Sequence, residues 1–220
     1  MRLKAKADKK PWNHKRMYRV YCELKLNLRI KPRKRIPKGE AKMLIQPIAF
    51  NICWSMDFMT DVLSCGRKFR TFNVIDDYNR EGICVAASFA LPAKKVTLLL
   101  DEVAVKRGYP EMIRVDNGPE FRSEIFKTWA SKHHILIQYI QPGKPAQNGL
   151  IERFNRTYRE DILDMNLFDN LREVRLITQE WLNTYNGERP HESLAGLPPV
   201  QFAKQRENLL AGIGGFSTSI

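Results

Sequence analysis

The sequence predicts an α/β fold built on a mixed five-stranded sheet, three antiparallel strands followed by two parallel ones, with helices flanking it. Two observations carry this prediction. Between residues 52 and 89, three strand-like segments follow one another in hairpin succession, which indicates antiparallel pairing. After them, strand and helix patterns alternate, which is typical of parallel strands. The 220 residues, 43% of them hydrophobic, suffice for one medium domain with a buried core plus extensions.

Five segments have the residue pattern of strands. They are Ile52 to Met59, Arg67 to Ile75, Ile83 to Phe89, Met112 to Val115 and Ile135 to Ile140. In the first segment, alternation places Ser55, Asp57 and Met59 on one face of the sheet. Asp76 and Asp77 begin the turn between the second and third strands, and we interpret both as turn formers and not as metal ligands.

Helical periodicity occupies much of the remaining chain. The expected helices are Asn13 to Leu28, Ala93 to Arg107, Phe121 to His133, the stretch around Glu152, Leu171 to Tyr185, and Pro198 to Arg206. The second of these, which Gly108 ends, is expected to be a right-handed crossover that lays the fourth strand parallel to the first. Asp57 in the first strand and Asp116 at the end of the fourth then become neighbours.

The stretch around Glu152 supplies a third acid. Residues 142–145 contain two prolines and a glycine that bar regular structure, and a helical pattern follows. At about 100° per residue, Asn148, Arg156 and Arg159 lie within roughly 40° of Glu152. The apolar stripe on the far side comprises Leu150, Ile151, Phe154, Tyr158, Ile162 and Met165. An acid among cations and an amide suits phosphate chemistry; the alternative is a solvated face with a Glu152–Arg156 ion pair.

Brought together, Asp57, Asp116 and Glu152 would repel one another unless cations lay between them. Magnesium takes hard oxygen ligands and keeps water positions open for phosphate. Two such ions activate the attacking oxygen and stabilise the leaving oxygen in a phosphoryl displacement. Two strand aspartates and one helix glutamate therefore predict a two-metal site.

The net charge of +13 is concentrated in one segment. Residues 1–42 contain 16 Lys and Arg and 3 acids, so their charge is 16 − 3 = +13. The remainder has 37 − 16 = 21 bases and 24 − 3 = 21 acids, which cancel. A basic arm beside a neutral body indicates a polyanionic partner, most simply nucleic acid. The alternative is a solubilising tail.

Four cysteines, Cys22, Cys53, Cys65 and Cys84, show neither CxxC spacing nor paired histidines. We interpret them as reduced thiols and not as zinc ligands or disulfides. No apolar run approaches the roughly 20 residues of a membrane span.

A series of motifs occurs in a fixed order along the chain. They are Trp54-Ser-Met-Asp57-Phe, Asn73-Val-Ile-Asp-Asp-Tyr-Asn-Arg80, Asp116-Asn-Gly-Pro-Glu-Phe121, Pro142-Gly-Lys-Pro-Ala-Gln-Asn148, Ile151-Glu-Arg-Phe-Asn155 and Tyr185-Asn-Gly-Glu-Arg-Pro-His191. Over residues 43–205 this series resembles the integrase-like core of bacterial insertion-sequence transposases of the insertion sequence three family, and more distantly retroviral integrases. The spacing is specific, since 152 − 116 − 1 = 35 residues separate Asp116 from Glu152, and Arg159 follows seven positions later.

The resemblance implies a ribonuclease H-like fold and a DDE recombinase, a cytoplasmic bacterial protein associated with the nucleoid. Asp57, Asp116 and Glu152 would be catalytic and would hold two Mg²⁺ or Mn²⁺ ions. The enzyme would cleave at transposon ends to free a 3′-hydroxyl, then use it to attack a target strand, as a homo-oligomer on DNA. The residues expected to bind DNA are Lys144, Gln147, Asn148, Arg156 and Arg159.

Relatives usually carry helix-turn-helix elements before the core, and only Asn13 to Arg35 resembles the end of such a region. We therefore expect either a truncated N-terminus or a helix-turn-helix partner protein. The expected division is a basic arm over residues 1–42, the catalytic core over 43–205 and a tail over 206–220. Arg189 and His191 match a family motif without an evident role.

Two other functions compete with the transposase hypothesis. The chain could be a DNA-binding remnant or regulator that completes no reaction, although the presence of all three acids argues for a live site. A ribonuclease H or junction-resolving nuclease would share the metal chemistry. The spacing around Glu152 and the Arg-Pro-His tail argue against that third function.

Overall fold

The computed structural model describes residues 13–26, 47–141 and 145–214. Its strands are β1 (Cys53–Val62), β2 (Lys68–Asp76), β3 (Gly82–Ser88), β4 (Met112–Val115) and β5 (Leu136–Tyr139). They form one five-stranded sheet in the order β3-β2-β1-β4-β5. β1 pairs antiparallel with β2 and β2 with β3, whereas β1 pairs parallel with β4 and β4 with β5. The predicted mixed sheet, with three antiparallel and two parallel strands, is confirmed.

The helices connect and cover these strands. They are α2 (His14–Glu23), α3 (Ala93–Arg107), α4 (Pro119–Arg122), α5 (Glu124–Lys132), α6 (Gly149–Tyr158), α7 (Leu171–Gly187) and α8 (Pro199–Gly214), with short turns η1 (Pro145–Asn148), η2 (Arg159–Leu163) and η3 (Glu192–Leu194). The crossover helix α3 has the predicted bounds, and Gly108 follows it with a φ of 83°. That left-handed conformation favours glycine and ends the helix.

Three predicted helices have different bounds. The single helix expected from Phe121 to His133 is two helices, because extended Ser123 (ψ 149°) breaks it and caps α5 through the backbone N of Phe126. The first helix ends at Glu23 and not near Leu28, since Lys25 has a φ of 53° and Leu28 lies outside the described residues. The last helix continues to Gly214, across the expected boundary at residue 205.

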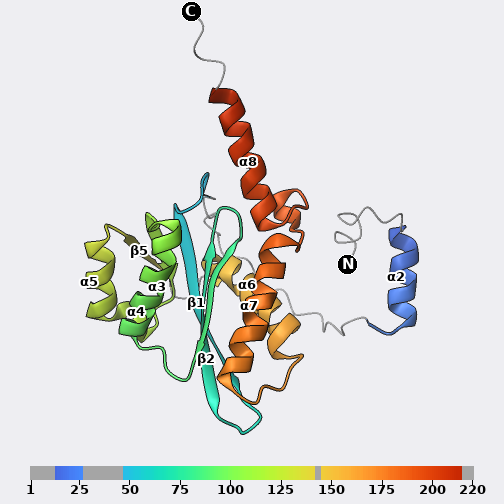
Figure 1. The fold of residues 1–220 in the computed structure, drawn as a ribbon, viewed down its shortest axis with the longest axis horizontal. Helices are drawn as coiled ribbons and strands as arrows, with labels where there is room; N and C mark the ends of the chain where they lie inside the picture. Colours follow the sequence, from blue (N-terminus) through green and yellow to red (C-terminus); the bar gives the residue numbers. More distant parts are fainter. Residues whose placement is uncertain (1–12, 27–46, 142–144, 215–220) are drawn as a thin grey trace, which may run out of the picture.

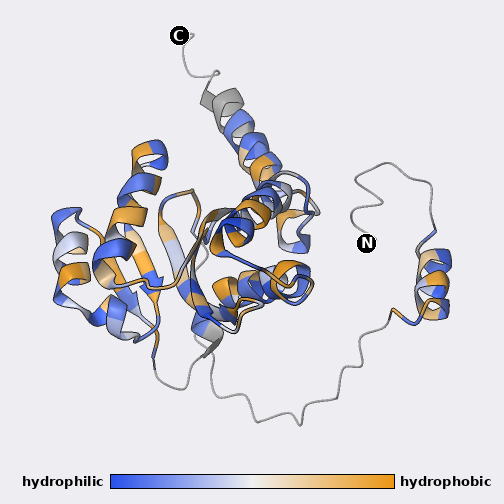
Figure 2. Ribbon diagram, turned by 60° about the horizontal axis from the view of Figure 1, so that its bottom comes forward, coloured by the Kyte–Doolittle hydropathy of each residue, from blue (hydrophilic) through white to orange (hydrophobic). Residues whose placement is uncertain are grey.

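The sheet separates two hydrophobic cores (Figure 1). On one face, α3, α4 and α5 cover Trp54 and Met56 of β1. On the other face, α6 and α7 pack Phe154 and Trp181 against β2 and β3. Apolar residues concentrate where helices face the sheet (Figure 2). Trp54 and Met56 are buried under α3, whereas Asp57, on the opposite face of β1, lies toward α6.

A π-helical turn, η2, follows α6 directly. It buries two consecutive residues, Ile162 and Leu163, and leaves Met165 74% exposed. The prediction that Met165 belongs to the buried stripe is therefore wrong, because a π turn adds a residue and shifts every later side chain around the axis. Asp161 lies in this turn, and its Oδ2 accepts hydrogen bonds from Trp181 Nε1 at 3.0 Å and Arg189 Nη1 at 2.6 Å.

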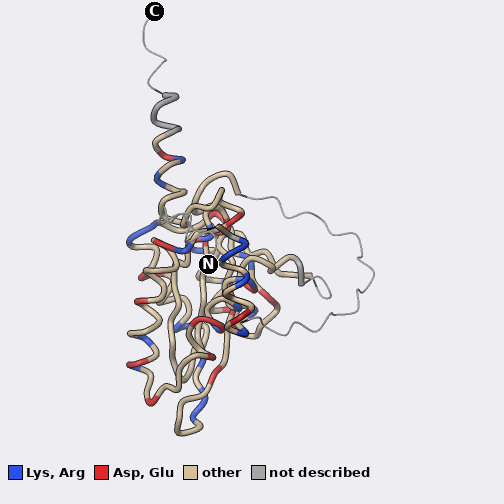
Figure 3. The backbone as a smooth tube through the Cα atoms, turned by 90° about the vertical axis from the view of Figure 1, so that its right-hand side faces the viewer, with Lys and Arg blue, Asp and Glu red and all other residues tan. Residues whose placement is uncertain are grey.

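Acidic and basic residues are interspersed along the body of the fold (Figure 3). The cysteines form no disulfide among the described residues; Cys53 is buried and Cys65 exposed. Within the described ranges, no helix combines the length and apolarity needed to cross a membrane.

Candidate active site

Asp57 occupies the middle of β1 on the face that α6 covers. Its Oδ1 accepts a hydrogen bond of 2.8 Å from the backbone N of Phe58, and its Oδ2 accepts one of 2.8 Å from Asn155 Nδ2 of α6. Both bonds fix the orientation of the carboxylate. Asp57 is thus a half-buried acid held from its own strand and from the neighbouring helix.

Asp116 directly follows β4, the parallel neighbour of β1. The last pair of that register is Ser55 with Arg114, so Asp57 and Asp116 each lie two residues further along adjacent strands. Asp116 Oδ1 accepts a hydrogen bond of 2.9 Å from the backbone N of Gly118. A Cβ at Gly118 would lie 2.9 Å from that same oxygen, so glycine keeps this carboxylate in place.

Glu152 lies in the first turn of α6, where the helix dipole favours a negative charge. α6 packs against β1 and β2, which places this turn beside the strand that carries Asp57. The Glu152 side chain is exposed and makes no hydrogen bond or ion pair with any described residue. The surface ion pair with Arg156, the alternative interpretation of this acid, is therefore not formed.

The charges of the three acids affect one another. The pKa of Asp57 is raised to about 6, first by burial and also by the negative charges of Asp116 and Glu152, while the hydrogen bonds from Phe58 and Asn155 oppose the increase. Like charges act in this way only when they lie near each other. The structure thus brings the three predicted acids, which the sequence separates widely, into one electrostatic neighbourhood.

Oxygen ligands of this kind are what a divalent cation prefers, and a cation would relieve the repulsion felt by Asp57. Among the described segments, however, no group of three His, Cys, Asp or Glu side chains lies close enough together to hold a metal ion. Glu152 has rotatable side-chain bonds and no partner to restrain them. The donor chemistry fits a divalent cation, and the assignment of these acids to a metal stays a prediction.

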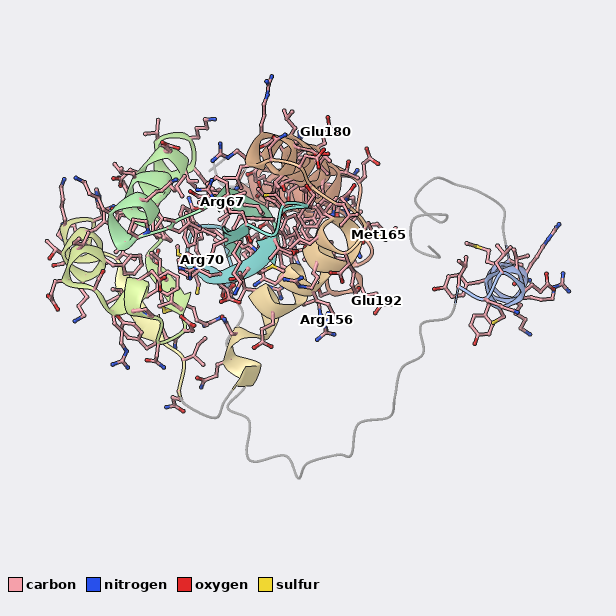
Figure 4. All side chains as sticks on the ribbon, turned by 90° about the horizontal axis from the view of Figure 1, so that it is seen from below. Arg67, Arg70, Arg156, Met165, Glu180 and Glu192 are labelled. Carbon is pink, nitrogen blue, oxygen red and sulfur yellow. The ribbon has the colours of Figure 1, made fainter. Side chains whose placement is uncertain are left out.

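The residues expected to bind DNA have different surroundings. Lys144 lies outside the described residues. Gln147 Oε1 accepts a hydrogen bond of 3.0 Å from the backbone N of Gln141, and Asn148 is buried, with no hydrogen-bond partner for its Oδ1 among described atoms. Arg156 is exposed and points away from the body of the fold (Figure 4).

Arg159 is already engaged by the protein. Its guanidinium donates to the backbone O of Thr60 at 3.0 Å and forms ion pairs with Asp61 at 3.4 Å and Asp164 at 3.5 Å. Binding DNA phosphate would require Arg159 to give up part of this network. Of the two arginines beside Glu152, Arg156 is the one available to an external ligand.

The two acids of the β2–β3 turn have structural partners. Asp76 accepts a hydrogen bond of 2.9 Å from the backbone N of Tyr78, which confirms it as a turn former. Asp77 is fully buried and forms an ion pair with Arg114. Its interpretation as a turn former is wrong, because a buried carboxylate needs a compensating cation and Arg114 of β4 supplies it.

Asn155, for which the sequence predicted no role, connects β2 to the Asp57 carboxylate. Asn155 Oδ1 accepts a hydrogen bond of 2.7 Å from Asn73 Nδ2 of β2, while its own Nδ2 donates to Asp57. The signal was available, since Asn155 lies three residues after Glu152 and so faces nearly the same side of the helix.

Two family profiles match the segments that carry these acids. A family profile described as "Integrase core domain" matches residues 49–145, and a second profile with the same description matches residues 133–199. The chain is 40% identical over 191 residues to the insertion element IS476 uncharacterized 39.2 kDa protein of Xanthomonas euvesicatoria, a match covering 87% of this chain and 55% of that protein.

It is 38% identical over 191 residues to the insertion element IS407 uncharacterized 31.7 kDa protein of Burkholderia multivorans, covering 87% of this chain and 69% of that protein. The chain thus spans little more than half to about two thirds of these relatives. Among solved structures, it is similar to the HTLV-2 integrase catalytic core domain in complex with magnesium, with a TM-score of 0.53 and 20% identity over 71% of this chain and 98% of that one. This last likeness is one of fold.

Proposed function

The chain belongs to the integrase core domain family found in bacterial insertion elements, and from that premise we propose that it is a DDE transposase. Its reaction would be cleavage of a DNA strand at a transposon end to free a 3′-hydroxyl, followed by attack of that hydroxyl on a target strand. The protein would work as a homo-oligomer assembled on DNA, with a helix-turn-helix protein as a further candidate partner.

One observation carries the proposal: the charges of Asp116 and Glu152 both raise the pKa of Asp57. An acid cluster of this kind is destabilising in the absence of a cation, and perturbed carboxylates are concentrated at functional sites. A fold that only bound DNA would gain nothing from three acids beside a DNA surface, because they repel phosphate.

Asp57, Asp116 and Glu152 are the residues that would hold Mg²⁺ or Mn²⁺. When bound, the metal would supply charge stabilisation for the attacking and leaving oxygens. Asn155 and the backbone N of Phe58 would fix the Asp57 carboxylate, and the backbone N of Gly118 would fix Asp116.

DNA contacts would come from Lys144, Gln147, Asn148, Arg156 and Arg159, of which the Arg156 side chain makes no hydrogen bond or ion pair with a described residue that would have to break first. Arginine presents a fork of N–H donors that matches a phosphate. These residues flank Glu152, so a strand held by them would pass over the acids.

A second candidate function is a DNA-binding regulator that completes no reaction. It is favoured by a specific observation, the lack of three convergent metal-ligating side chains in the described residues. The two functions differ in whether added Mg²⁺ produces a nick.

The deciding experiment is Mg²⁺-dependent nicking of a DNA duplex that carries the element's own ends. Glu152→Gln should abolish nicking and leave DNA affinity nearly unchanged, since one neutralised acid hardly alters phosphate binding. Glu160→Gln, an exposed acid two turns later on the same continuous helix, is the matched control and should nick like the wild type. Nicking that survives Glu152→Gln would exclude the assigned role, and a wild type that binds DNA without nicking it would favour the regulator.

A further inference from the structure

A pocket of about 530 Å³ lies on the flank of α6, between that helix, the β2–β3 turn and the loop after α7. Its charged lining consists of Arg80, Arg153, Arg189 and one acid, Glu192. Figure 4 labels Glu192, in η3 at the rim of this pocket, and Arg156, in α6. A volume of this size lies in the range of small-molecule sites and exceeds that of a single phosphate group. The pocket is therefore large enough for a nucleotide unit and strongly cationic.

Arg80 forms the buried cationic wall. It is only 6% exposed, and its backbone has a φ of 62°, a left-handed conformation that is costly for arginine. Its Nη1 donates to the backbone O of Asp77, whereas the Asp77 carboxylate is bound by Arg114. Burial lowers the pKa of Arg80, although the charge of Asp77 opposes the change. A strained residue that carries a buried charge into a pocket is more typical of a binding site than of a simple turn.

The other two arginines lie nearer to solvent. Arg153 is exposed and makes no hydrogen bond or ion pair with a described residue. Arg189 is held by Asp161 at 2.6 Å, which fixes one edge of its guanidinium and leaves further N–H groups to donate. Thr157 and Ser193 add hydroxyl groups to the lining. The lining thus offers guanidinium and hydroxyl donors beside a single carboxylate, that of Glu192.

His191 supplies an unused polar atom. Its Nε2 is buried and has no hydrogen-bond partner within the described part of the chain. Burial and the charges of Arg189, Arg80 and Arg153 together lower the pKa of His191 to about 4, so the ring is neutral at physiological pH. The ring is held edge-on against Tyr185 at 5.1 Å. A fixed neutral imidazole among three arginines suits a hydrogen bond to an anion.

We propose that this pocket binds a backbone phosphate of the DNA strand, at a position flanking the phosphate over the three acids. Arg153 is the principal contact, with Arg189, Ser193 and His191 as further donors. Charge-assisted bonds from arginine, with hydroxyl groups beside them, are the usual contacts to DNA phosphates.

The location supports this ligand. Arg153 follows Glu152 directly, so the two side chains leave α6 about 100° apart. A strand that passes over Glu152 then continues round the helix onto Arg153. The choice of DNA as the ligand rests on the proposed function. The binding of a phosphate does not depend on strand cleavage.

Arg153→Gln tests the proposal in the full chain, with Arg172→Gln as the matched control. Arg172 is exposed on α7, and its side chain makes no hydrogen bond or ion pair with a described residue, so both variants lose one surface charge. DNA affinity is measured by fluorescence anisotropy in EDTA at several salt concentrations. Arg153→Gln should reduce the slope of log K against log salt by about 0.9, and Arg172→Gln should leave the slope unchanged. Equal slopes in both variants would overturn the proposal.

A second measurement locates the phosphate. Ser193→Cys should be captured by an oligonucleotide that carries an alkyl disulfide tethered to a backbone phosphate, through thiol–disulfide exchange that releases the outer thiol, above the background from exposed Cys65 in the wild type. Yields equal to the wild type would contradict the proposal. Inorganic pyrophosphate serves as a free-anion probe: if it raised the melting temperature through Arg153 while the DNA slope stayed unchanged, the assignment to DNA would be wrong.

The two proposals fail separately. Normal nicking with equal salt slopes would reject the pocket and leave the transposase intact. A reduced slope in Arg153→Gln without any nicking would reject the transposase and support the pocket.

Discussion

Asn155 Nδ2 donates a 2.8 Å hydrogen bond to Asp57 Oδ2 across 98 residues of sequence. The bond joins the helix that carries Glu152 to the strand that carries Asp57, and Asn73 completes the chain from β2. Because the bond favours the ionised form of Asp57, it partly offsets the burial that raises the pKa of this acid. Asn155 thus links the position of α6 to the charge of the site.

Asn155→Ala should shift the rise of the nicking rate to higher pH, because Asp57 loses a donor that favours its charged form. The unfolding free energy should fall by roughly 1–3 kcal/mol, since Asn73 Nδ2 loses its partner inside the fold. The measurements are a pH–rate profile and urea unfolding. Asn183→Ala, an exposed amide on α7, is the control and should change neither; a wild-type pH profile in Asn155→Ala would contradict the linkage.

Asp57 should make the metal-free protein less stable as the pH rises from about 4 to about 6. Its pKa is about 6 in the folded state against 3.8 as the ordinary value, so between these values the folded state binds more protons than the unfolded state. Stability then falls with rising pH, by at most ~3 kcal/mol at ~1.36 kcal/mol per pH unit.

Asp57→Asn removes this titration. In EDTA, the variant should gain unfolding free energy relative to the wild type as the pH is raised from 4 to 7, and Mg²⁺ should stabilise only the wild type at pH 7. A difference between the two proteins that does not vary with pH would show that the burial of Asp57 is not the cause.

Gly82→Ala should destabilise the fold by roughly 1–3 kcal/mol through overpacking. A Cβ at this position would lie 2.5 Å from Leu182 Cδ1 and 2.8 Å from Phe154 Cε2, so β3 and α7 could not keep their present separation. Gly187→Ala is the control, because nothing lies within 4 Å of its Cβ position. Thermal unfolding compares the two, and equal melting temperatures would argue against the close packing of β3 on α7.

Removing residues 1–42 should flatten the salt dependence of DNA binding, because that segment carries the entire net charge of +13. Replacing the five bases among residues 31–38 with glutamine keeps the chain length and should give an intermediate slope. The slope of log K against log salt is the measurement. If the deletion left it unchanged, the arm would be a solubilising tail.

The parts of the fold that were predictable from sequence depend on the periodicity of apolar residues and on the right-handedness of crossover connections between parallel strands. Alternation in β1 placed Asp57 on the correct face, and a right-handed crossover placed β4 beside β1. The Asp77–Arg114 ion pair was not predictable, since it joins side chains whose proximity appears only after the sheet has formed. The exposure of Met165 was missed because a uniform step of about 100° per residue does not describe a π turn.

The π turn η2 also determines the direction in which side chains after α6 point around the helix axis. α6 packs on the sheet, whereas Asp161 of η2 accepts hydrogen bonds from Trp181 of α7 and Arg189 of the loop after it. Deleting Glu160, which precedes Asp161 in η2, would restore ordinary α-helical spacing and rotate Asp161 by roughly 100°, away from both donors. The loop that carries Arg189 would then lose its anchor, while the three acids would keep their places. A single-residue deletion there would therefore release the loop of the phosphate pocket from η2 while Asp57, Asp116 and Glu152 stay together.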